Sequence, residues 1–114
     1  MEAKQSVFIK RPGAPIRHVN MSLTLENLQR YVGGYIEVVR VGTFNDQEVV
    51  FICNEEGKLR GLETNFYLFG DFANDAIKGD VVFLQAKGED LIGLEGDLRE
   101  FRGWLQDQGL VFEE

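Results

Sequence analysis

Short apolar runs, rich in β-branched and aromatic residues, alternate with polar turns along most of the chain. Runs of this length and composition are typical of β-strands. The pattern predicts strands over residues 4–10, 16–20, 35–41, 48–53, 81–86 and 110–112. The runs 35–41 and 48–53 favour an antiparallel hairpin across the loop 42–47. The run 81–86 is apolar at consecutive positions, as expected of a central strand that is buried on both faces.

Two segments follow a helical period instead. Apolar residues spaced by three and four predict a helix over 25–32, capped by Ser22 or Thr24 and ended by Gly33 in the left-handed conformation. A second amphipathic segment predicts a helix over 94–108, which Gly109 ends.

Residues 58–78 follow neither period, and we expect them to be irregular. The turn 54–57 that precedes them predicts a positive φ at Gly57.

These elements predict an α+β fold, a small and mainly antiparallel sheet of about 5 strands with two helices packed on it. A chain of 114 residues has room for one hydrophobic core. We therefore expect a single domain over residues 1–114.

The net charge of −7 is unevenly distributed. Residues 1–20 carry four basic side chains and one acidic side chain, whereas residues 57–114 carry six basic and twelve acidic ones. Nonspecific binding to nucleic acid depends on clustered Lys and Arg. We therefore expect no direct nonspecific nucleic-acid binding, and a partner protein with a basic surface instead.

No segment is typical of a membrane span or a signal peptide. The longest apolar run, 49–53, has five residues, whereas a bilayer span needs about 20. Residues 1–10 contain charges at short intervals and lack the apolar centre of a signal peptide. The single cysteine, Cys53, lies in an apolar run and fits a buried thiol in a reducing compartment. We expect a cytoplasmic protein with no membrane contact.

Residue types that support catalysis are scarce. The chain has one histidine, His18, and one cysteine, and it lacks glycine-rich phosphate loops and nucleophile elbows. His18 and Cys53 would form a nucleophile pair only if the fold brought them together. The sequence therefore predicts a binding protein rather than an enzyme, with no metal and no cofactor.

The strongest candidate site is the polar loop that follows the apolar run 48–53, because a strand gives a loop a rigid base. Further along, the segment 66–72 contains four aromatic residues, Phe69 and Phe72 among them. So short a segment is not expected to bury all four. An exposed apolar patch usually marks a contact surface. The candidate binding residues in these two segments are Asn54, Glu55, Glu56, Lys58, Arg60, Asn65, Phe66 and Tyr67.

The acidic C-terminal third is a second candidate surface. Its carboxylates could replace phosphates against a basic groove on a partner. Turns and helix starts also attract acidic residues, so a solvated charged face is the alternative. The residues in question are Glu89, Asp90, Glu95 and Asp97, with Glu100 and Asp107 beyond them.

Two blocks of sequence, VGGYIE at 32–37 and CNEEGKL at 53–59, resemble the phage- and plasmid-borne family catalogued as domain of unknown function 3846. The resemblance covers residues 4–86. Glu63 and Thr64 stand where members of that family usually carry a Pro-Pro step, and the acidic helix expected over 94–108 is less typical of the short members. The resemblance implies an origin on mobile elements and no defined activity.

Small phage-encoded domains of such families often act against bacterial immunity. By that analogy, the leading hypothesis is a counter-defence inhibitor that occludes a bacterial immune effector such as a CRISPR nuclease. The alternative is a protein that binds or sequesters a nucleotide signal, with Arg30, Arg40, Lys58 and Arg60 as a phosphate clamp. A homodimer is compatible with both hypotheses.

Overall fold

The computed structural model describes residues 3–70 and 74–112 of the chain. This part contains nine strands and two helices. In chain order they are β1 (Gln5–Lys10), β2 (Arg17–Met21), α1 (Leu25–Val32), β3 (Ile36–Phe44), β4 (Gln47–Asn54), β5 (Thr64–Phe69), β6 (Asn74–Lys78), β7 (Val81–Lys87), β8 (Asp90–Ile92), α2 (Leu98–Asp107) and β9 (Leu110–Phe112). The α+β class and the two helices are confirmed.

The strands form two sheets rather than the single sheet of about 5 strands that we expected. The larger sheet has six strands in the order β2-β1-β7-β4-β3, with β8 attached to β7, and the smaller sheet has the order β6-β5-β9. All pairings are antiparallel. The predicted central position of the run 81–86 is confirmed, because β7 lies between β1 and β4.

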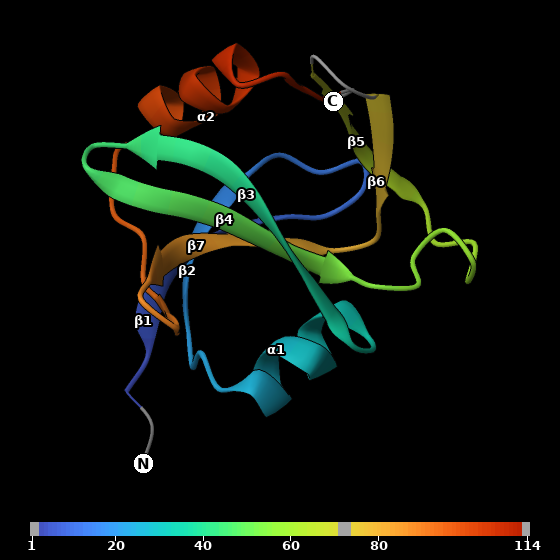
Figure 1. The fold of residues 1–114 in the computed structure, drawn as a ribbon, viewed down its shortest axis with the longest axis horizontal. Helices are drawn as coiled ribbons and strands as arrows, with labels where there is room; N and C mark the ends of the chain where they lie inside the picture. The colour runs from blue at the N-terminus through green and yellow to red at the C-terminus, as the bar shows by residue number, and fades with distance from the viewer. Residues whose placement is uncertain (1–2, 71–73, 113–114) are drawn as a thin grey trace.

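The larger sheet is covered on both faces, as Figure 1 shows, with α1 on one side and both α2 and the smaller sheet on the other. Alternating side chains of β1, β4 and β7 point to opposite faces, as strand geometry requires. Val7, Val50 and Val82 pack with Leu28 and Val32 of α1. Their sequence neighbours face the second layer, which consists of α2 and the smaller sheet. This two-sided burial explains why these strands are apolar at nearly every position.

Aromatic rings fill the second layer. The Phe83 ring centroid lies 5.7 Å from that of Phe51, 6.0 Å from that of Phe66 and 5.6 Å from that of Phe101. These partners belong to β4, β5 and α2, so one central side chain joins the larger sheet to the smaller sheet and to the second helix. All four rings are fully buried.

The hairpin of β3 and β4 is confirmed, and it is longer than predicted. Its turn consists of Asn45 and Asp46, whose φ angles are 49° and 62°. Positive φ at both central residues is the signature of the tight turn that matches the twist of a hairpin. The expected loop 42–47 is therefore mostly strand, with a register shift between Arg40 and Gly42.

The prediction that residues 58–78 are irregular is wrong, because β5 and β6 lie there. A register shift falls between Thr64 and Phe66, which leaves Asn65 as the extra residue. This bulge interrupts the alternation by which a strand is recognised in sequence. The expected edge strand 110–112 is present as β9, and it pairs with β5.

The second helix begins at Leu98 rather than at residue 94. Asp97 caps it by accepting a hydrogen bond at 3.0 Å from the Glu100 N–H. Gly96 has φ +153°, and a Cβ at this position would lie 2.6 Å from Phe44 Cε2. Leu94 is buried in the core ahead of the helix, so the periodic spacing there reflects burial and not helical structure.

The aromatic cluster predicts a large loss of stability for Phe83→Ala. Loss of a fully buried phenylalanine costs about 3–5 kcal/mol, out of a total of about 5–15 kcal/mol for a domain of ordinary stability. Urea unfolding followed by circular dichroism measures this difference. Leu59→Ala is the matched control because that side chain is 87% exposed, and we expect a change below about 0.5 kcal/mol. Equal effects for the two variants would contradict the assignment of the core.

Candidate binding cleft

A cleft of about 370 Å³ lies where the end of β4 and the following loop approach β6. Glu37 of β3 contributes to its lining from the neighbouring edge. The complete lining is Glu37, Cys53, Asn54, Glu55, Glu56, Gly57, Lys58, Leu59, Asp75, Ala76, Ile77 and Lys78. The structure thus brings the predicted loop together with a strand that lies about twenty residues further along the chain.

Asn54 positions the loop. It is buried, its Nδ2 donates to the Val32 carbonyl at 3.1 Å, and its Oδ1 accepts from the Glu56 N–H at 2.7 Å. The first bond ties the loop to the end of α1, and the second shapes the turn. A buried amide with such partners stabilises the local conformation by about 1 kcal/mol for each bond. Asn54 therefore acts mainly as a support for the two glutamates that follow.

Two basic side chains fix the rest of the loop. Lys58 pairs with Asp75 of β6, and Arg60 Nη1 donates to the Gly33 carbonyl at 2.5 Å. The predicted positive φ at Gly57 is wrong, since positive φ occurs at Gly61 instead. Gly57 is needed for space, because a Cβ there would lie 3.1 Å from Lys78 Cβ.

The cleft is more acidic than basic. Its lining has the carboxylates of Glu37, Glu55, Glu56 and Asp75 against the ammonium groups of Lys58 and Lys78. Lys78 Nζ donates to Thr64 Oγ1 at 2.5 Å. Among residues 3–70 and 74–112, neither Glu55 nor Glu56 takes part in an ion pair. Their exposed carboxylates therefore remain available to a cationic partner.

Cys53 is buried in this lining and is a poor nucleophile. Burial, reinforced by the negative charges of Glu37 and Asp75, raises the pKa of its thiol to about 12. The Cys53 Sγ lies 4.0 Å from Glu37 Oε1. His18 stacks on Phe8, with 4.4 Å between ring centroids. It lies on β2, three strands from β4, which corresponds to about 14 Å at the usual strand spacing. The fold does not form the nucleophile pair.

Asn65 and Phe66 are structural residues, and the prediction that they contact a partner is corrected. Asn65 is 4% exposed, and its Nδ2 donates at 2.7 Å to both the Lys10 and the Gly79 carbonyls, which ties β5 to the larger sheet. Phe66 is fully buried in the aromatic layer. Tyr67 points to the other side of β5, where it stacks on the exposed Phe69 at 6.3 Å. Phe72 lies outside the described residues.

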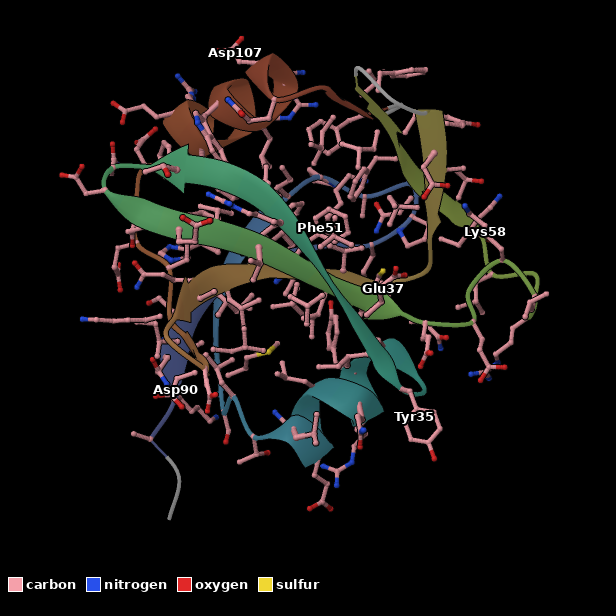
Figure 2. The ribbon with its side chains drawn as sticks, viewed as in Figure 1. Tyr35, Glu37, Phe51, Lys58, Asp90 and Asp107 are labelled. Carbon is pink, nitrogen blue, oxygen red and sulfur yellow. The ribbon has the colours of Figure 1, made fainter. Side chains whose placement is uncertain are left out.

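The acidic C-terminal residues do not line the cleft. Glu89 lies in the turn between β7 and β8, Asp90 is the first residue of β8, and the Glu95 backbone exchanges two hydrogen bonds with the Gln47 side chain. Asp97 is the helix cap. Figure 2 shows Asp90 and Asp107 far from Glu37 and Lys58 in the view. The loop and the acidic segment are thus two separate surfaces.

The four predicted phosphate ligands do not converge. Arg30 pairs with Glu26 within α1, and Arg40 pairs with Glu48 across the β3–β4 hairpin. Lys58 pairs with Asp75, and Arg60 donates to the Gly33 carbonyl. A phosphate clamp requires several donors directed at one point, and this arrangement spreads them over different elements.

Sequence reasoning missed three charged contributors to the cleft. Glu37 is exposed and stands among apolar residues of β3, and a charge within an apolar run was the available signal. Asp75 and Lys78 lie in the segment that we expected to be irregular, so no pattern indicated their place beside the loop.

No group of three or more His, Cys, Asp or Glu side chains in residues 3–70 and 74–112 is arranged to hold a metal ion. In the same ranges, no helix is both long enough and apolar enough to cross a membrane.

A known family matches most of this chain. The family described as Domain of unknown function (DUF3846) matches residues 4–106. The chain belongs to this family. The match extends beyond the expected residues 4–86 and includes most of α2, so the acidic C-terminal segment is part of the DUF3846 domain.

The matched range of this chain contains strands β1 to β8, helix α1 and all but the last residue of α2, and β9 lies beyond it. No curated protein and no solved structure matches this chain. The family description names no activity.

The raised pKa of Cys53 predicts slow alkylation. At pH 8 the thiolate fraction of a thiol with pKa about 12 is about a thousandfold below that of an ordinary cysteine with pKa near 9. Iodoacetamide labelling followed by mass spectrometry should therefore be slow for the folded protein. The same chain in urea, the control, should react at the ordinary rate. Equal rates in the two states would show that Cys53 is an accessible, reactive thiol.

Proposed function

We propose that this protein acts by binding a bacterial protein with a basic surface, and that it occludes an immune effector such as an RNA-guided nuclease. The observation that carries the proposal is the cleft, in which Glu55 and Glu56 form no ion pair with residues 3–70 and 74–112 and stand on a loop held by the end of α1 and by β6. A preorganised site avoids the entropic cost of ordering a loop on binding. The resemblance to phage- and plasmid-borne proteins motivates the counter-defence setting.

The chemistry of the cleft favours association over catalysis. Its thiol has a raised pKa, and one of its four carboxylates, Asp75, is paired with Lys58. Acidic groups on a rigid surface accelerate encounter with a basic partner and reject acidic ones. An occluding protein needs only this selectivity and sufficient contact area.

The cleft and its surroundings favour a protein partner over a nucleotide. A nucleotide phosphate would meet the negative charges of Glu37, Glu55 and Glu56 in the cleft. The cations proposed as a clamp have carboxylate or carbonyl partners of their own. No observation favours the nucleotide hypothesis over occlusion.

The function is tested in bacteria that carry an RNA-guided nuclease and are challenged with a phage bearing its target sequence. Expression of the protein should restore plaque formation. The double variant Glu55→Lys with Glu56→Lys should abolish the effect, because reversal of two contacting charges costs about tenfold or more in affinity.

The matched control is Glu89→Lys with Asp90→Lys, which reverses the same number of charges outside the cleft and should retain activity. Circular dichroism checks that both variants are folded. Failure of the unaltered protein to restore plaques would contradict the counter-defence role against this nuclease. Loss of activity only in the control variant would place the contact surface on the acidic C-terminal segment.

A further inference from the structure

We infer that the partner inserts an extended, lysine- or arginine-containing segment into the cleft, where it pairs with the free edge of β6 as an additional strand. This inference rests on the proposed function and specifies its binding mode. Strand addition to an exposed sheet edge is a common way for a small domain to hold a peptide, because main-chain hydrogen bonds supply affinity and side-chain pockets supply selectivity.

The edge of β6 pairs with no strand among the described residues, and the loop approaches it at Lys78, where a Cβ on Gly57 would lie 3.2 Å from the carbonyl oxygen. In the smaller sheet β6 stands at the end of the order β6-β5-β9, and β5 is its one neighbour. Across residues 3–70 and 74–112, no backbone hydrogen bond outside the sheet involves residues 75–78. Unpaired backbone N–H and C=O groups on an edge are a template for another strand.

The cleft runs along this edge. Asp75, Ala76, Ile77 and Lys78 are consecutive in β6, and all four line the cleft. Successive side chains of a strand point to opposite faces, so a cavity above one face would touch only alternate residues. Contact with four in succession favours a cavity beside the strand. These four residues span about 13 Å at the usual rise per residue, the length of a guest strand of about four residues.

The side chains around the edge specify the guest. Cys53 and Ile77 are both buried and line the inner part of the cleft, and Glu37 is the register partner of Cys53 on β3. A guest lysine pointing inward would lay its aliphatic stem over these apolar side chains and bring its ammonium group to Glu37. Long basic side chains are suited to such mixed surroundings. Glu55 and Glu56 provide further acceptors at the rim.

The Lys58–Asp75 ion pair crosses from the loop to β6 beside this edge. The two side chains are 59% and 46% exposed, and exposed pairs of this kind contribute little to stability. A guest cation can therefore replace Lys58 at Asp75 without disrupting the fold. The loop itself stays in place, because Asn54 and Arg60 hold it independently of this pair.

The test is an NMR titration of the full ¹⁵N-labelled chain with two synthetic hexapeptides of alternating valine and lysine. One has an ordinary backbone. The other carries N-methyl groups at alternate positions, which removes backbone donors on one edge and keeps the charges. The first peptide should shift the amide signals of residues 75–78 and 53–59, and the methylated peptide should bind at least about tenfold more weakly, in keeping with the loss of several hydrogen bonds.

Glu37→Gln should weaken binding of the first peptide about three- to tenfold, and Glu89→Gln, the matched control, should leave it unchanged. Absence of shifts, equal affinity for both peptides, or shifts centred on residues 89–97 would each overturn strand addition.

The plaque assay separates this outcome from the proposed function. If the Glu55 and Glu56 reversals abolish plaque restoration while the peptides do not bind at β6, occlusion stands and strand addition fails. If the peptides bind as expected while the protein never restores plaques, the edge is a binding site and the counter-defence role fails.

Discussion

The fold depends on the aromatic contacts of Phe83. Its ring touches Phe51 within the larger sheet, Phe66 from the smaller sheet and Phe101 from α2. Aromatic pairs at these distances stabilise a core beyond the area they bury. The smaller sheet has three strands, and its buried Phe66 packs on Phe51 and Phe83 of the larger sheet. Its attachment through Phe66 is what places β6 beside the end of β4 and thereby creates the cleft.

Local patterns predicted the parts of the fold that depend on local chemistry. The helix 25–32 was recognised with its correct bounds, since Thr24 and Gly33 cap it as expected. The central position of β7 followed from a run that is apolar on both sides. The smaller sheet was missed because the Asn65 bulge interrupts β5, and because β9 pairs with it across a long stretch of sequence. The start of α2 was misplaced because Leu94 is buried without being helical.

The candidate site was predicted only in part, because some of its residues follow one strand directly and others come from distant segments. Glu55, Glu56 and Lys58 follow an apolar strand directly, and the structure places all three in the cleft lining. Glu37 and Asp75 reach the cleft only through pairing of distant segments, which no local period encodes. Asn54 and Asn65 resemble contact residues in the sequence, because they are polar and lie near strand ends. Both are in fact buried supports. The distinction between a support and a contact residue depends on burial, which a turn-rich segment does not reveal.

Hydrogen exchange of the protein in complex with its effector would locate the contact surface, because it compares the cleft with the acidic segment in one experiment. Backbone amides of residues 53–59 and 75–78 should exchange more slowly in the complex than in the free protein, since the partner covers the cleft and the β6 edge. Amides of residues 89–97 should exchange at the same rate in both states. Protection confined to residues 89–97 and α2 would contradict binding at the cleft, and so would a complex in which neither segment is protected.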